Sequence, residues 1–235
     1  AEGGMFLYAG LLLVAAMFAV PLRITPPAAP ATSFAESFGE GWSLVLGGEG
    51  RPFLQLTVVD AIEAFFTTAT PLLITLLAAV NYRGSALSYG VLFTAYVVGG
   101  VVAGLVLGRW NPRSRVGPLF GAALLAAGAA YVLSVSVPSV LALGAAAWFA
   151  VGLTTSAYTS TKYTFFRGAV APEKIGRLFA NMYLFPGISS SAGALVISAA
   201  AVQGAPAELG VAIGVGFFVA GTLAFALPGV RRMRF

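Results

Sequence analysis

The chain contains neither cysteine nor histidine, and only 9% of its 235 residues are charged. Without cysteine and histidine there is no thiol nucleophile, no disulfide, no Ser-His-Asp triad and no thiolate or imidazole ligand for zinc or haem. We therefore expect no metal and no cofactor, and we expect that the protein is not an enzyme. The side-chain chemistry that remains is that of carboxylates, hydroxyls, amides and arginines.

The scarcity of charge also excludes a water-soluble domain, in which about a quarter of the residues are charged. Here 59% of the residues are apolar, and about 20 helical residues cross a bilayer core of about 30 Å. The sequence predicts an all-α fold, a polytopic helical membrane protein with seven transmembrane helices. The predicted spans are Met5–Leu22, Phe53–Val80, Ala86–Gly108, Gly117–Val137, Ser139–Thr161, Ile175–Ala201 and Ala207–Pro228.

Basic residues indicate the orientation of these spans, because cytoplasmic loops retain lysine and arginine. If the spans alternate, the only basic residue on one side of the membrane is Arg83. The other side holds Arg23, Arg51, Arg109, Arg113, Arg115, Lys162, Arg167, Lys174, Arg177, Arg231, Arg232 and Arg234. This asymmetry predicts a multi-pass protein of the plasma membrane with a cytoplasmic C-terminus. It leaves no basic surface with exposed aromatic residues for nucleic acid.

The longest polar stretch, residues 23–52, separates the first predicted span from the other six. After the proline-rich Thr25–Ala31, its apolar residues recur at helical spacing, opposite acidic ones. The apolar set is Phe34, Phe38, Trp42, Val45 and Leu46, and the acidic set is Glu36, Glu40 and Glu49. This pattern favours a short amphipathic helix on the cytoplasmic face of the membrane over a flexible linker.

Seven spans with an external N-terminus are also the layout of retinal proteins and of G-protein-coupled receptors. A retinal protein needs a lysine in its last span, and Ala207–Pro228 contains none. The receptor class would need an extracellular disulfide, which the chain cannot form. An intramembrane aspartyl protease needs two aspartates, and Asp60 is the only aspartate in the sequence. Retinal proteins and G-protein-coupled receptors are therefore excluded, and an intramembrane aspartyl protease is nearly excluded.

A different class is indicated by the loop after the third predicted span. The stretch Gly104–Arg115 (GLVLGRWNPRSR) resembles the signature loop of the major facilitator superfamily, which lies between the second and third helices of each six-helix half. Gly108 stands where that family usually has aspartate, and Asn111 where it often has glycine. The stretch Pro172–Arg177 (PEKIGR) resembles the proline, acid and Gly-Arg segment that precedes the fifth helix of a half.

This resemblance implies a division of the chain into three parts. Residues 1–22 would hold the sixth helix of a twelve-helix transporter, residues 23–52 the cytoplasmic interdomain segment, and residues 53–235 the six-helix C-terminal bundle. A chain beginning just before a sixth helix is expected to be a fragment that lacks its N-terminal half, or else to pair with a second subunit. The family's efflux branch implies a secondary active transporter that exports a small molecule by alternating access, coupled to protons.

Acidic residues inside a span are costly and therefore indicate function. Asp60, Glu63, Thr67 and Thr70 form one polar stripe at helical spacing in the second span. Two ionised carboxylates one turn apart repel each other, which favours proton uptake by one of them. We therefore predict proton coupling at Asp60 and Glu63. The alternative is that both acids lie at the cytoplasmic rim, where they cap the helix or pair with arginine.

Hydroxyl and amide side chains within the spans are the candidates for substrate binding. The alternative for the hydroxyls is a hydrogen bond to the preceding turn of their own helix. A stripe of small residues along the predicted span Ile175–Ala201 favours close packing against another helix over substrate binding. The substrate candidates are Thr67, Thr70, Tyr158, Thr161, Asn181 and Tyr183, and the stripe consists of Gly187, Ser191, Ala194 and Ser198.

Gating residues follow from the resemblance, in which the signature loop helps to hold the inward gate shut. It implies this role for Gly104, Arg109 and Arg113, whereas simple anchoring by the positive-inside rule would explain both arginines equally well. A rival function is that of a non-transporting membrane subunit, a scaffold that retains a transporter-like fold and binds partner proteins or lipids. The altered signature loop and the scarcity of intramembrane charge favour the scaffold.

Overall fold

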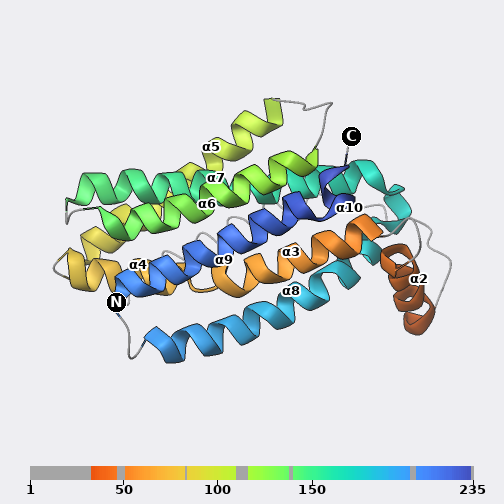
Figure 1. The fold of residues 1–235 in the computed structure, drawn as a ribbon, viewed down its shortest axis with the longest axis horizontal. Coiled ribbons are helices and arrows are strands. Elements are labelled where there is room, and N and C mark those ends of the chain that lie inside the picture. Colours follow the sequence, from red (N-terminus) through yellow and green to blue (C-terminus); the bar gives the residue numbers. More distant parts are fainter. Residues whose placement is uncertain are drawn as a thin grey trace, which may run out of the picture. The chain divides into compact units, whose positions relative to one another are not determined.

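The computed structural model describes residues 33–46, 51–82, 84–109, 116–137, 140–201 and 205–233, and all regular elements in these ranges are helices (Figure 1). The predicted first span, Met5–Leu22, lies outside the described residues. The helices are α2 (Phe34–Leu46), α3 (Arg51–Thr67), α4 (Thr70–Asn81), α5 (Ala86–Arg109), α6 (Val116–Ser136), α7 (Leu141–Ala169), α8 (Pro172–Ala201), α9 (Pro206–Ala226) and α10 (Pro228–Arg231).

Six helical segments in the described part of the chain are long and apolar enough to cross a membrane, when α3 and α4 are taken together. The all-helical, multi-pass character of the protein is thus confirmed. One predicted boundary is wrong: the span expected to end at Thr161 continues as α7 to Ala169. Lys162 is therefore a buried helical residue and does not lie in a loop. Its buried charge is paired with that of Asp60, as described below.

The first described span is interrupted between α3 and α4. Pro71 lacks a backbone N–H and its ring clashes with the carbonyl four residues earlier, which belongs to Thr67. The first helix ends at Thr67, and the second begins at Thr70 with the proline in its first turn, where the missing donor costs nothing. The chain therefore crosses as two stacked helices with a short break between them.

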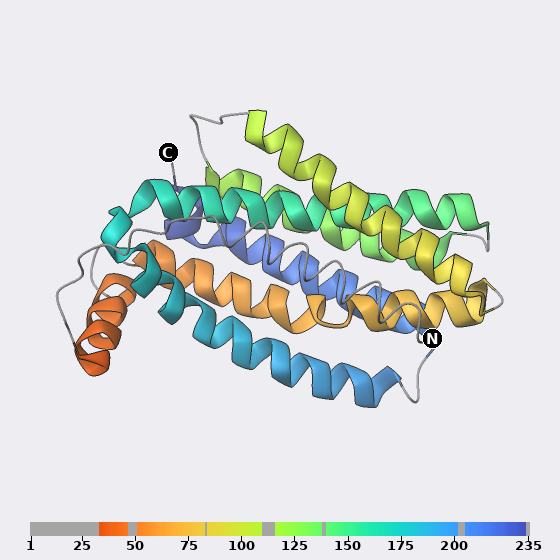
Figure 2. The ribbon, with the colours of Figure 1, turned by 180° about the vertical axis from the view of Figure 1, so that it is seen from behind.

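The spans pack in a pattern that repeats after three helices (Figures 1 and 2). When only the six described spans are numbered, the first packs on α8 and α9 through α3, and the fourth, α7, packs correspondingly on α5 and α6. The third and sixth spans, α6 and α9, pack on each other. Shifting every span by three positions therefore maps the main contacts onto one another. Because three is odd, the shift also reverses the direction of each helix, as in an inverted repeat.

Glycines allow the closest of these approaches. Gly99 of α5 faces the Phe149 carbonyl of α7, and Gly152 of α7 faces the Tyr96 carbonyl of α5, so that a Cβ at either glycine would overlap backbone atoms. Small residues let membrane helices approach until their backbones touch, which increases dispersion contacts where the hydrophobic effect is absent. The α5–α7 contact therefore depends on two reciprocal glycines.

We expect Gly152→Ala to destabilise the bundle by about 3 kcal/mol or more, because the added methyl group meets rigid backbone and forces α5 and α7 apart. Gly90→Ala in α5 is the matched control, since a Cβ there meets nothing within 4 Å. Unfolding in mixed micelles measures both variants. Equal stability of the two variants would contradict the reciprocal glycine contact.

The small-residue stripe predicted to pack lies on the exposed side of α8. Its members are Gly187, Ser191, Ala194 and Ser198, all of which are exposed. The close contact is made on another face, where Gly193 approaches the Phe65 carbonyl and the Ser189 hydroxyl donates a 2.6 Å hydrogen bond to the Ala61 carbonyl. Among the described residues α8 packs on α3 through its other face, so packing by the stripe stays a prediction.

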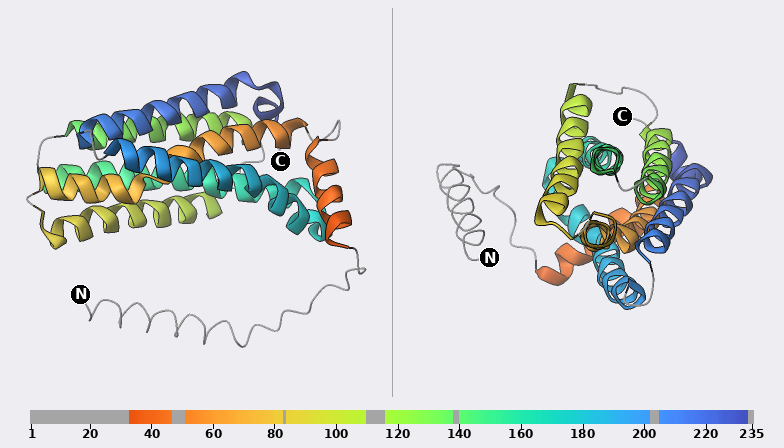
Figure 3. Two further views of the ribbon diagram at one scale, coloured as in Figure 1. Left: turned by 90° about the horizontal axis from the view of Figure 1, so that it is seen from below. Right: turned by 90° about the vertical axis from the view of Figure 1, so that its left-hand side faces the viewer.

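The predicted amphipathic helix is present as α2, which lies across the end of the bundle (Figure 3). Val45 is buried, Trp42 packs edge-on against Phe185 of α8, and Glu40 forms an ion pair with Arg177 of α8. The helix therefore uses its apolar face against α8. It sits at the end of the bundle where α3, α6 and α8 also begin.

Candidate functional site

A buried ion pair joins α3 and α7, the first and fourth of the six described spans. The Lys162 ammonium of α7 lies 2.5 Å from an Asp60 carboxylate oxygen of α3, and the two residues are 4% and 3% exposed. Removing two charges from water costs several kcal/mol per ion, so such a pair is weak as a source of stability. In a membrane span it indicates function by default.

Tyr158 completes the environment of the Asp60 carboxylate. Its hydroxyl donates a 3.0 Å hydrogen bond to the same oxygen that accepts from Lys162. Tyr158 lies one helical turn before Lys162 and is fully buried, with its ring edge-on to Phe120 of α6. The predicted substrate residue Tyr158 therefore binds Asp60 directly in this structure.

Three tyrosine rings surround the Lys162 ammonium. The nitrogen lies 5.2 Å from the ring centroid of Tyr158, 5.7 Å from that of Tyr163 and 5.6 Å from that of Tyr183. All three distances fall within the range of cation–π attraction. The hydroxyls of Tyr163 and Tyr183 form a hydrogen bond with each other, and both residues are partly exposed. We call Tyr158, Tyr163 and Tyr183 the tyrosine cage.

Glu63 lies one turn beyond Asp60 and is close enough to interact electrostatically with Asp60 and Lys162. Its carboxylate accepts a 2.6 Å hydrogen bond from the Thr67 hydroxyl. Within the described ranges it forms no salt bridge. The cluster thus combines two acids with one base, and it carries one excess negative charge when all three groups are ionised.

The depth of the cluster follows from the packing of α3 on α9. The 21 residues of α9 match the length of a bilayer core, so that its middle residue, Gly216, marks the membrane centre. A Cβ on Gly216 would overlap the Phe66 ring, which places Phe66 at that level. Asp60 precedes Phe66 by six residues, or about 9 Å of helix, inside the half-thickness of about 15 Å. This register places the pair inside the apolar layer.

Three other predicted substrate residues make contacts outside the charge cluster. The Thr70 hydroxyl lies 2.5 Å from that of Tyr131 in α6, both buried, and joins α4 to α6. Thr161 donates to the Ala157 carbonyl of its own helix at 2.7 Å, which is the alternative expected for membrane hydroxyls. Asn181 is buried beside Gly41 of α2 and donates to the Arg177 carbonyl.

Two of the predicted gating residues, Gly104 and Arg109, lie on α5, which contributes no residue to the cluster. Gly104 is exposed on α5, and a Cβ there would meet nothing within 4 Å. Arg109 is the exposed last residue of α5, and Arg113 lies outside the described residues. The gate therefore stays a prediction.

Lys162 is the site residue that the sequence alone does not single out, because it falls just beyond the predicted span Ser139–Thr161. A signal was present: Lys162 follows Tyr158 by one helical turn, at the end of a run of hydroxyl residues. Residues four apart share a helix face. Extending the helix through the run would have placed a lysine and a tyrosine together on it.

Comparisons with protein-family models, with curated proteins and with solved structures find no match to this chain.

Proposed function

We propose that the chain forms the C-terminal half of a secondary active transporter resembling the major facilitator superfamily, which exports a small molecule by alternating access in exchange for protons. The observation that carries this proposal is the acid–base cluster of Asp60, Glu63 and Lys162 inside a membrane bundle. Ionisable groups at such depth occur mainly along substrate, ion or proton pathways.

The packing pattern of the six spans supports the same proposal. Three spans and their inverted copy are the building plan of one major facilitator half, with the substrate site near the midplane. The spans α5 and α8 are the least buried of the six. In a two-half transporter these exposed faces would contact the N-terminal half or a second subunit, which we expect as the partner of this chain.

The distribution of basic residues supports an orientation with the C-terminus in the cytoplasm. Arg51, Arg109, Lys174 and Arg231 all lie at the end of the bundle where α3 and α8 begin and α5 and α9 end. We call this the basic end. Cytoplasmic segments retain Lys and Arg, so we assign the basic end to the cytoplasm and place the protein in the plasma membrane.

The charge balance of the cluster suggests how a proton would act. Binding of one proton makes the two acids and the lysine neutral together, which an apolar environment favours. The Lys162 ammonium lies 2.5 Å from the Asp60 carboxylate and stabilises its charge. Glu63 is therefore the acid that would accept this proton. Asp60 and Lys162 would then hold the site in register while Glu63 gains and loses the proton.

The absence of cysteine makes a direct accessibility test possible, since each introduced cysteine is the only thiol. In a transporter the open face of the tyrosine cage lines a water-filled path, so Tyr183→Cys should react rapidly with a membrane-impermeant maleimide. Val219→Cys is the control, because Val219 is exposed on α9 at the depth of Glu63 and would face lipid. Labelling of the full chain in membranes, read by mass spectrometry, compares the two rates.

Imposing a pH gradient should change the Tyr183→Cys labelling rate if the site alternates its access. A rate equal to that of Val219→Cys, with or without the gradient, would contradict the transporter proposal. It would instead favour the scaffold, in which the fully paired and buried Asp60 has a structural role.

A further inference from the structure

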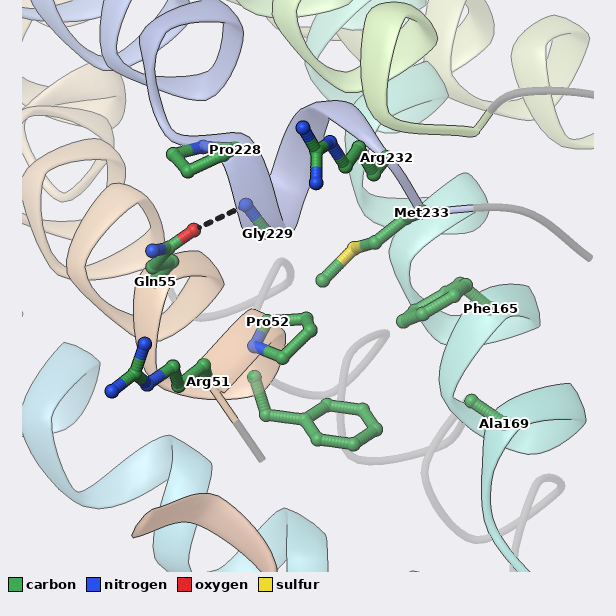
Figure 4. A pocket seen from close by; sticks show the side chains of 10 residues that line it. Arg51, Pro52, Gln55, Phe165, Ala169, Pro228, Gly229, Arg232 and Met233 are labelled. Atoms are coloured by element: carbon green, nitrogen blue, oxygen red, sulfur yellow. Dashed lines mark hydrogen bonds between the residues drawn. The ribbon is translucent and has the colours of Figure 1, made fainter. Parts of the chain in front are cut away.

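A cavity of about 580 Å³ opens at the basic end between the beginning of α3, the end of α7 and α10 (Figure 4). It lies apart from the charge cluster and the tyrosine cage. Its lining residues are Arg51, Pro52, Phe53, Gln55, Phe165, Ala169, Pro228, Gly229, Arg232 and Met233.

The polar side of this cavity is basic. Arg51 and Arg232 come from segments far apart in the sequence, with Pro52 and Gly229 between them in the close view (Figure 4). Both arginines are exposed, and neither forms a salt bridge with a described residue. None of the described residues that line the cavity is acidic. Among these residues an anion would therefore meet two positive charges and no opposing one.

Gln55 joins the two segments that carry the arginines. Its side-chain oxygen accepts a 2.7 Å hydrogen bond from the Gly229 N–H, which ties α10 to α3. The amide nitrogen of Gln55 makes no hydrogen bond within the described ranges. A third donor is therefore present in the same cavity.

The remaining wall is apolar, with Phe53, Phe165 and Met233 among its residues. A free inorganic anion would gain nothing from this surface, whereas an amphiphile would cover it with hydrocarbon. The cavity therefore matches a ligand that joins an anionic group to an apolar chain.

The depth of the cavity agrees with such a ligand. Arg51 precedes Phe66 by fifteen residues, which places it about 22 Å from the bilayer centre. Headgroups extend to about 20–22 Å from that centre. The arginine thus lies at the level of lipid phosphates, and anionic lipids gather in the cytoplasmic leaflet.

We propose that this cavity is a binding site for the phosphate headgroup of an anionic phospholipid, held by Arg51, Arg232 and Gln55, with the start of an acyl chain against the apolar wall. The proposal rests on the cavity and not on the transport function. The orientation of the basic end decides only which leaflet of the bilayer supplies the lipid.

Native mass spectrometry of the full chain, titrated with phosphatidylglycerol and separately with phosphatidylcholine, tests this site. Each basic residue contributes about fivefold to anionic lipid affinity, so Arg51→Gln with Arg232→Gln should weaken phosphatidylglycerol binding about 30-fold. Phosphatidylcholine binding should change little. The matched control is Arg109→Gln with Lys174→Gln, which removes two exposed charges at the same end but outside the cavity.

Equal weakening in the control pair would overturn the proposal in favour of diffuse attraction by the basic end. Displacement of phosphatidylglycerol by inorganic phosphate would overturn the choice of a lipid and assign the cavity to the free anion. If the variant Arg51→Gln with Arg232→Gln misfolds, Gln55→Glu provides a second test, because it keeps an oxygen that accepts from the Gly229 N–H. It adds a negative charge, and unchanged phosphatidylglycerol binding in this variant would also overturn the proposal.

Discussion

Lys162→Ala is expected to destabilise the folded bundle by about 3–5 kcal/mol, because it removes one partner of a buried ion pair and leaves the other uncompensated. Asp60 is 3% exposed and would retain, among the described residues, the hydrogen bond from the Tyr158 hydroxyl. Unfolding of the full chain in mixed micelles measures the loss.

Asp60→Asn is expected to be milder than Lys162→Ala. The new amide oxygen can still accept from the Lys162 ammonium, and the tyrosine cage still surrounds the cation at 5.2–5.7 Å. Cation–π attraction increases to about 2 kcal/mol or more when the site is desolvated. The two single variants should therefore differ, although they break the same pair.

Replacing both partners should recover most of the stability. Asp60→Asn with Lys162→Met removes both charges of the pair, and apolar replacements of buried ion pairs are often neutral or stabilising. Glu40→Gln is the comparison, since the Glu40–Arg177 pair is partly exposed and such pairs contribute less than about 1 kcal/mol. A Lys162→Ala loss no larger than that of Glu40→Gln would show that the buried pair is unimportant for the fold.

Hydropathy alone was sufficient to predict the six described spans, because a membrane helix satisfies its own backbone and is marked by a run of apolar residues. Helical periodicity likewise predicted α2, whose residues from Phe34 to Leu46 present one apolar side. These features are local in sequence. Each depends on residues within a few turns of one another.

The charge cluster could not be found in the same way, because its partners lie far apart in the chain. Asp60 and Lys162 are separated by 102 residues. In a hydropathy analysis a lysine marks the end of an apolar run, because the sequence does not show which acid neutralises it. The alternative position of Asp60 at the membrane rim follows from counting about 20 residues back from Val80, as for a single straight crossing. The contact of Phe66 with Gly216 instead places it deeper, since α3 and α4 together exceed the length of a bilayer crossing.

The predicted substrate residues also differ in whether their contacts are local or distant in sequence. Thr161 bonds its own helix, as the sequence alternative allowed, whereas Thr70 bonds Tyr131, 61 residues away. Tyr158 and Tyr183, 25 residues apart in sequence, meet only because α7 and α8 place both rings around Lys162. Side-chain type suggested these candidates, but helix packing decides which of them share a site.

Glu63→Gln is expected to abolish proton-driven transport while leaving the Asp60–Lys162 pair intact. The glutamine keeps an oxygen that accepts from the Thr67 hydroxyl, and it is permanently neutral, like a protonated glutamate. The cluster would then be fixed in one charge state. In vesicles containing the full chain, pH-driven movement of a cationic, a neutral and an anionic dye should fall to the level of empty vesicles.

Two controls separate this effect from general damage. Glu208→Gln removes an exposed acid in the first turn of α9 and should leave transport unchanged. Thr67→Val removes the hydrogen-bond donor but keeps the ionisable Glu63, so coupling should persist with an altered pH dependence. Retention of pH-driven transport in Glu63→Gln would mean that the proton is carried elsewhere, with Asp60 as the remaining acid of the cluster.

A readout without substrate tests the same charge balance in the chain itself. A protonated carboxyl group gives an infrared carbonyl band distinct from that of a carboxylate, and we expect this band in the full chain in lipid vesicles near neutral pH, because one proton neutralises the cluster. Glu63→Gln should remove the band, whereas Glu208→Gln should not. Since Asp60 is paired with Lys162, a band that disappears only in Asp60→Asn would reverse the assignment of the two acids.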